Sequence, residues 1–152
     1  MSGAAITPRN ILVLCAHNRT RSVMIAALLR TYLGEGYTVE SAGFGPAGLA
    51  AMPEAVQLLA EQGIDVSGHV SVQVTPDMVR WADLILTADK KQVMAVVADL
   101  GGDFDTTYTL PEYVSRLSFK MDRPRGFSYL ASSVGEVEDP TGRLMPVWKS
   151  VF

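Results

Sequence analysis

Short apolar runs alternate with longer amphipathic segments along the chain. Runs rich in Ile, Leu, Val and Thr are typical of buried strands, and we expect strands at residues 10–15, 37–41, 83–88 and 104–110. The segments between them repeat apolar residues at helical spacing, which predicts helices at residues 22–33, 52–63, 75–82, 89–100 and from 111 to before Pro124. This alternation predicts an α/β fold with a small open four-stranded parallel sheet and helices on both faces.

Helix start and stop signals support several of these boundaries. Pro53 stands at a first helical position, and Gly63 follows the end of the same segment. Thr75 is a typical N-cap residue with Pro76 directly behind it, and Asp89 is the expected cap of the next helix. The helical segments are therefore better bounded than the strands.

Two stretches show neither pattern. Residues 121–138 predict a long irregular segment, which in a compact domain is usually functional or mobile. The stretch GFGPAG at 43–48 matches the G-x-G-x-x-G dinucleotide fingerprint, but Pro46 interrupts it and the next helix starts only near Pro53. We therefore interpret it as a glycine-rich connection.

Composition narrows the classes of protein. The chain has 152 residues, 48% of them hydrophobic, which suits one globular domain over residues 1–152. A net charge of −3 offers no basic field for nucleic acid, and no apolar run is long enough for a membrane span. The N-terminus lacks a signal-peptide pattern, and a single cysteine excludes a disulfide framework or a cysteine-rich metal site. We expect a cytoplasmic protein.

The single cysteine lies at the first strand-to-helix turn. Cys15 ends the first strand, and Ser22 begins the following helix directly after Arg21. The residues between must curl so that backbone N–H groups point inward, which forms an anion-binding nest at a helix N-terminus. We expect phosphate to be bound there by Ala16, His17, Asn18, Arg19, Thr20, Arg21 and Ser22.

This loop suits nucleophilic chemistry. Amide dipoles and a nearby cation favour the thiolate, which is the reactive form of cysteine. Arg21 can direct two parallel N–H groups onto phosphate oxygens, and the Ser22 hydroxyl can donate to the thiolate. Taken alone, Cys15 would be a core residue and Arg21 a surface cation. Their spacing at this turn favours a nucleophile inside an oxyanion cradle.

The segment VLCAHNRTRS resembles the low-molecular-weight protein tyrosine phosphatase family. The motifs ESAGF, GIDVSGH, ADLILTAD, YTLPEYV and EDPTGR follow in family order, so the resemblance extends from about residue 11 to residue 148. It implies a flavodoxin-like sheet, no metal or other cofactor, and a phosphocysteine intermediate.

The resemblance also implies roles by position. Cys15 would be the nucleophile and Arg21 the phosphate clamp. Asn18 would brace the loop, and Ser22 would assist the thiolate. His69 aligns with a family histidine that helps to fix the loop asparagine, although a surface or capping histidine is equally compatible with SGHVS.

Asp139 would be the general acid by resemblance, and chemistry supports it. Expelling a phenolate needs a proton donor, and the later attack of water needs a base, so one carboxylic acid can serve both steps. Taken alone, EDP is a turn signal, and the adjacent Glu138 is a fallback carboxylate. His17 replaces the usual loop glycine, and we expect its side chain at the rim.

The sequence departs from the family pattern in several places. Thr20 replaces the second loop cysteine of many members, so no disulfide can form beside Cys15. Ala26 and Ala27 stand where a glutamate is usual early in the first helix. The final family helix is expected to be short or truncated.

These observations favour a phosphomonoester hydrolase, most specifically a protein-tyrosine phosphatase acting on a phosphotyrosine protein or a small aryl phosphate. Arsenate reductases of the same fold are an alternative. Their built-in relay needs further cysteines, so only resolution by an external thiol would fit. A non-catalytic phosphate-binding module is a third reading, but it would not need an acid such as Asp139.

Overall fold

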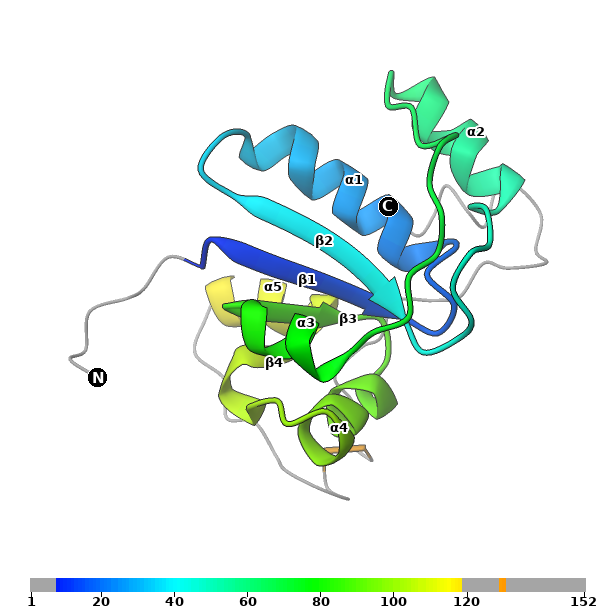
Figure 1. Ribbon diagram of the computed structural model, residues 1–152. Helices are drawn as coiled ribbons and strands as arrows, with labels where there is room; N and C mark the ends of the chain where they lie inside the picture. Colours follow the sequence, from blue (N-terminus) through cyan, green and yellow to red (C-terminus); the bar gives the residue numbers. More distant parts are fainter. Residues whose placement is uncertain (1–7, 119–128, 131–152) are drawn as a thin grey trace.

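The computed structural model describes residues 8–118 and 129–130 (Figure 1). Its strands are β1 (Asn10–Cys15), β2 (Thr38–Gly43), β3 (Leu84–Thr87) and β4 (Thr107–Thr109). Its helices are α1 (Arg21–Leu33), α2 (Pro53–Glu61), α3 (Pro76–Trp81), α4 (Lys90–Asp99) and α5 (Leu110–Ser118), with a 3₁₀ turn η1 at Phe104–Thr106.

The strands form a four-stranded sheet in the order β2-β1-β3-β4, with every pair parallel. The open parallel α/β sheet that the sequence pattern predicts is therefore confirmed, as is the flavodoxin-like arrangement that the family resemblance implies. Leu14 is level with Ala42 of β2 on one side and Thr87 of β3 on the other. The chain moves to opposite sides of β1 after its first and second strands, so a crevice is expected beyond the carboxyl ends of β1 and β3.

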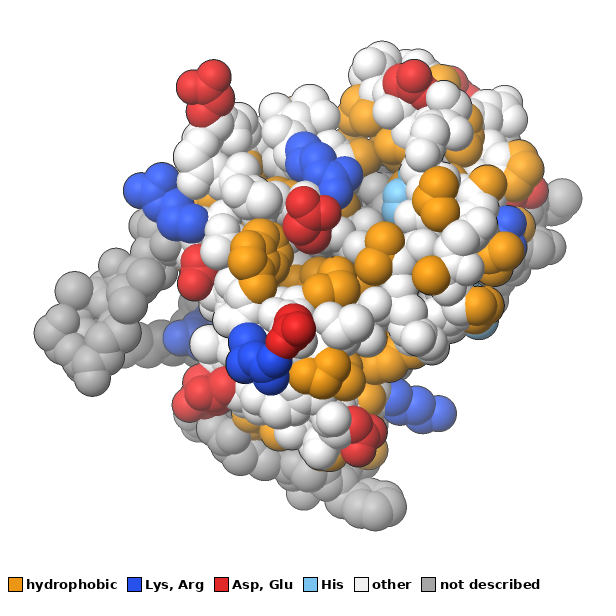
Figure 2. All heavy atoms as spheres, in the orientation of Figure 1, with side chains coloured by type: hydrophobic (Ala, Val, Ile, Leu, Met, Phe, Trp, Pro, Cys, Tyr) orange, Lys and Arg blue, Asp and Glu red, His pale blue; other side chains and the backbone are white. Residues whose placement is uncertain are grey.

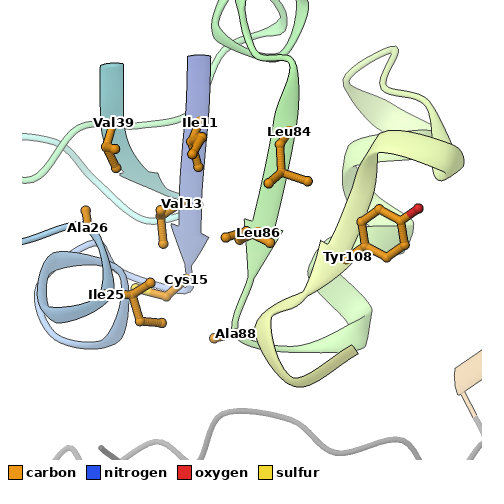
Figure 3. Packing of buried hydrophobic residues seen from close by; sticks show 10 residues of the cluster. All are labelled: Ile11, Val13, Cys15, Ile25, Ala26, Val39, Leu84, Leu86, Ala88 and Tyr108. Atoms are coloured by element: carbon orange, nitrogen blue, oxygen red, sulfur yellow. The ribbon is translucent and has the colours of Figure 1, made fainter. Parts of the chain in front are cut away.

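Helices cover both faces of the sheet, as expected. On one face of the sheet, the side chains of Ile11, Val13 and Cys15 of β1 form an apolar cluster (Figure 3). The same cluster contains side chains of α1 and β3. Leu12 and Leu14 point to the opposite face and pack with residues of α3 and α4. Because β1 is buried on both faces, its sequence is a continuous apolar run rather than an alternating one. Helix α2 packs on α1 through a separate apolar cluster.

The expected helix signals act as predicted. Thr75 accepts a hydrogen bond from the backbone N–H of Met78 at 3.2 Å, at the start of α3. Pro53 is the first residue of α2, and Gly63 follows that helix with a φ of +77°. Asp89 is the N-cap residue of α4.

The expected fourth strand is shorter than predicted. Phe104–Thr106 forms a 3₁₀ turn, and β4 starts only at Thr107. The Asp103 carboxylate accepts a hydrogen bond from the N–H of Asp105 at 2.8 Å, so the aspartate caps a turn where threonine and aromatic residues favour a strand.

The expected irregular segment 121–138 lies mostly outside the described residues. Tyr129 and Leu130 are described and are helical. Tyr129 is fully buried, and its ring meets Phe104 edge to face with 5.4 Å between centroids. This part of the segment therefore contributes to the core.

The face in Figure 2 shows basic and acidic side chains interspersed, with no continuous basic field. Among the described residues, no helix has the length and apolar character needed to cross a membrane.

Candidate active site

The Cys15 thiol lies at the floor of the turn between β1 and α1. The residue is 2% exposed. Its Sγ lies 2.9 Å from the Ser22 hydroxyl oxygen, and the backbone N–H of Asn18 donates to the same sulfur at 3.2 Å. A hydroxyl and a backbone amide thus converge on the thiol, an arrangement that stabilises negative charge on sulfur.

Asn18 holds the loop in this shape. It is fully buried and has a φ of +54°, in the left-handed region that asparagine tolerates better than most residues. Its amide group donates to the hydroxyls of Ser22 at 2.8 Å and Ser41 at 3.0 Å. Its side-chain oxygen accepts from the N–H of Val72 at 2.9 Å. One side chain therefore ties the loop to β2 and to the segment before α3.

The two histidines expected near the loop, His69 and His17, differ in their surroundings. His69 lies with Nε2 2.8 Å from the backbone oxygen of Asn18, so the expected contact with the loop asparagine is present. His17 is exposed, as expected for a residue at the rim.

The glycine-rich stretch 43–48 packs against the outside of the loop. The N–H groups of Phe44 and Gly45 donate to the oxygen of Ala16 at 2.8 and 2.9 Å. A Cβ on Gly43 would lie 2.7 Å from the backbone nitrogen of Asn18. No helix opens at this stretch, so its interpretation as a connection is confirmed. Its support of the loop was missed in the sequence analysis; the available signal is a pair of glycines, Gly43 and Gly45, at the end of a strand.

Arg19 and Thr20 fix the second half of the loop. The Arg19 Nε donates to the backbone oxygen of Ala50 at 2.6 Å, and the Arg19 carbonyl accepts from Met52 at 2.9 Å. Thr20 is buried, with 5% of its surface exposed. The segment before α2, through Ala50 and Met52, therefore holds the part of the loop that is farther along the sequence from Cys15.

Arg21 forms an ion pair that sequence reasoning missed. Its Nη1 lies 3.1 Å from Oδ1 of Asp89, and its side chain is 5% exposed, against 34% for Asp89. The two residues are 68 positions apart. They meet because β1 and β3 are neighbours whose carboxyl ends are level. The sequence marks Asp89 only as a helix cap.

Asp139 and Glu138 lie outside the described residues, so the expected acid has no position here. Across residues 8–118 and 129–130, no group of three or more His, Cys, Asp or Glu side chains is placed to hold a metal ion. The described part of the site is a buried thiol in a rigid loop, beside an arginine, at the carboxyl edge of a parallel sheet.

These features define a class of α/β protein with a buried cysteine in the loop between its first strand and first helix. The model of the family described as low molecular weight phosphotyrosine protein phosphatase matches residues 10–142, and the chain belongs to this family.

Individual relatives carry different activities in their names. The chain is 45% identical over 91 residues to the probable low molecular weight protein-tyrosine-phosphatase EpsP of Ralstonia solanacearum; the match spans 57% of this chain and only 62% of that relative. It is 34% identical over 118 residues, 78% of each chain, to an arsenate reductase of Brevibacillus brevis. The solved structure of the YwlE arginine phosphatase from Geobacillus stearothermophilus has a TM-score of 0.77 and 30% identity, over 95% of this chain and 83% of that one.

Proposed function

We propose that this protein hydrolyses aryl phosphate monoesters, as a protein-tyrosine phosphatase, through a phosphocysteine intermediate. The observation that carries the proposal is the convergence of the Ser22 hydroxyl and the Asn18 N–H on the Cys15 sulfur. A purely structural thiol in a core would not need two polar partners at the end of a strand. Membership of the phosphatase family supports the same chemistry.

The first chemical step transfers phosphate to the protein. Backbone N–H groups of residues 16–21 and the Arg21 guanidinium hold the phosphate oxygens. The Cys15 thiolate attacks phosphorus, an S–P bond forms, and the bond from phosphorus to the aryl oxygen breaks. Asp139 donates a proton to the departing oxygen, so a neutral phenol leaves.

The second step returns the enzyme to its starting state. A water molecule attacks phosphorus, Asp139 takes a proton from it, and the S–P bond breaks. Inorganic phosphate leaves and the thiolate is regenerated. The Ser22 hydroxyl, 2.9 Å from the sulfur, stabilises the thiolate both as nucleophile and as leaving group.

Arsenate reduction is the second candidate, supported by the similarity to the Brevibacillus brevis enzyme. Cys15 would attack arsenate in the same loop. Because the sequence holds one cysteine, reduction would require an external low-molecular-weight thiol. We favour hydrolysis because its full cycle needs no second thiol.

A single panel of assays separates the candidates. We expect release of phosphate from phosphotyrosine and phenyl phosphate, abolished in Cys15→Ser, which should still bind phosphate or vanadate. Arsenate-dependent oxidation of an added thiol without phosphatase activity would favour the reductase. Turnover of phosphoarginine in preference to phosphotyrosine would indicate that this protein is an arginine phosphatase, like the similar YwlE enzyme. Phosphate binding with no turnover would indicate a binding module.

The proposed partner is a phosphotyrosine protein or a small aryl phosphate. We place the reaction in the cytoplasm, because the mechanism needs Cys15 as a reduced thiol and the cytoplasm keeps thiols reduced.

A further inference from the structure

Asp89 contacts the phosphate-loop arginine from outside the loop. It follows β3 and caps α4, whereas Arg21 begins α1. Its Oδ1 lies 3.1 Å from Arg21 Nη1, and 4% of Arg21 is exposed. The first turn of α1 holds no acidic residue. The carboxylate that pairs with Arg21 comes instead from the N-cap of α4.

The Asp89 carboxylate is itself held in place. Its Oδ2 lies 3.4 Å from the amide nitrogen of Gln92. The Gln92 side-chain oxygen accepts from the N–H groups of Ala88 at 3.1 Å and Asp89 at 3.0 Å. The N–H of Ala88 in turn donates to Leu14, the residue before Cys15, at 3.0 Å. Hydrogen bonds through Gln92 and Ala88 therefore connect the carboxylate to β1, the strand that ends at Cys15.

This geometry has two opposing effects on phosphate. A guanidinium is planar, so a carboxylate on one of its nitrogens fixes the plane before substrate arrives. The same carboxylate adds negative charge beside an anion site, which weakens binding of a phosphate dianion. An interaction that costs ground-state binding but improves orientation acts on the transition state.

We propose that Asp89 is a positioning residue that orients the Arg21 guanidinium for phosphoryl transfer and so raises kcat rather than substrate affinity. This inference rests on the proposed function of the Cys15 loop. It assigns to Asp89 a role beyond capping α4, and the test must separate the two roles.

The kinetic test compares Asp89→Ala, Asp89→Asn and the matched cap variant Asp103→Ala, which removes the side chain that caps η1. Misorientation of a transition-state contact costs up to about 100-fold, so we expect Asp89→Ala to lose about 10- to 100-fold in kcat. Inhibition by inorganic phosphate should change less than about threefold. Asp89→Asn keeps an acceptor oxygen and should recover part of kcat, and Asp103→Ala should leave kcat unchanged.

A kcat for Asp89→Ala within about twofold of the starting protein would overturn the inference, as would an equal loss of kcat and phosphate affinity. If Asp89→Ala does not fold, Asp89→Asn decides through a double-mutant cycle with Arg21→Lys. Coupled effects on kcat support the inference, and additive effects overturn it.

A spectroscopic readout is independent of turnover. In ¹⁵N NMR of the arginine side chains, the Nη signals of Arg21, assigned by their loss in Arg21→Lys, should be separate because rotation is hindered. They should merge in Asp89→Ala and stay separate in Asp103→Ala. Separate signals in a protein without phosphatase activity would contradict the proposed function and leave the Asp89–Arg21 orientation standing. Unchanged Arg21 signals in Asp89→Ala would overturn the inference alone.

Discussion

At the scale of single residues, Asn18 forms the hydrogen bonds that hold the loop in its shape. Its positive φ turns the backbone at this point of the loop. Its hydrogen bonds to Ser22, Ser41 and Val72 connect the loop to α1, to β2 and to the segment before α3. Its removal leaves buried groups without partners, which costs roughly 1–3 kcal/mol for each such group. Its backbone conformation costs most other side chains a further 1–2 kcal/mol or so.

We therefore predict that Asn18→Ala and Asn18→Gly both lose activity, but that Asn18→Gly is the more stable by about 1 kcal/mol, since glycine tolerates the left-handed backbone. Chemical denaturation of both variants measures the difference. Equal stability of the two variants would show that backbone strain at Asn18 is negligible, and an Asn18→Ala protein as stable as the parent would contradict the network itself.

At the scale of elements, the close approach of the end of β2 shapes the loop. A Cβ on Gly43 would meet the backbone of His17 at 2.8 Å as well as that of Asn18, and backbone cannot move aside as a flexible side chain can. A Cβ on Gly68 meets nothing within 4 Å.

Gly43→Ala should therefore displace the loop and reduce kcat/KM by about tenfold or more. Gly68→Ala should change the free energy of unfolding by no more than about 0.5 kcal/mol and leave kcat/KM unchanged. Steady-state kinetics on an aryl phosphate with both variants checks this. Full activity of Gly43→Ala would mean that the loop tolerates a shift of its support.

The elements themselves were largely predictable, because their signals are local. β1 is a continuous apolar run. Helices α2, α3 and α4 have apolar positions at helical spacing and a proline or a cap residue at their start. The start of β4 was not, because the threonine and aromatic residues of 104–110 favour a strand, whereas the Asp103 side chain caps a 3₁₀ turn at Phe104–Thr106. The burial of Tyr129 was also missed, because residues 121–138 show no apolar periodicity that would mark a buried position.

At the scale of the whole molecule, Tyr129 is a part of the core that lies far along the sequence from the residues it contacts. Its hydroxyl donates to the buried Glu112 of α5 at 2.9 Å, and its ring packs on Phe104. We predict that Tyr129→Phe lowers the free energy of unfolding by about 0.5–1.5 kcal/mol, through the lost hydrogen bond. Tyr129→Ala should cost about 3–5 kcal/mol, because it also leaves a cavity. Thermal denaturation of both variants measures these losses. Unchanged stability in both would show that the contacts of Tyr129 with Glu112 and Phe104 do not stabilise the fold.

Some residues of the site could be predicted from nearby sequence, whereas others meet only because the chain folds. Cys15, Asn18, Arg21 and Ser22 lie within one short stretch, residues 15–22, and were predicted from one motif. Asp89 could not be predicted as an arginine partner, because its proximity arises only from the pairing of β1 with β3.

The general acid is the least local assignment, and Asp139 stays a prediction. General acid catalysis contributes about 10²–10⁴-fold, and the contribution grows as the leaving group becomes more basic. Asp139→Asn should therefore slow phenyl phosphate severely and p-nitrophenyl phosphate much less. A constant ratio of kcat values along a series of aryl phosphates would exclude Asp139 as the acid, and Glu138 would be tested next.

Trapping the phosphoenzyme tests the covalent mechanism most directly. The protein is mixed with an aryl phosphate, denatured at short times, digested and analysed by mass spectrometry, with Cys15→Ser as the control. We predict that phosphate appears on the peptide containing Cys15, through sulfur, before free phosphate accumulates, and that prior alkylation of Cys15 abolishes both. Steady release of phosphate with Cys15 unmodified, or undiminished release by the alkylated protein, would contradict the account.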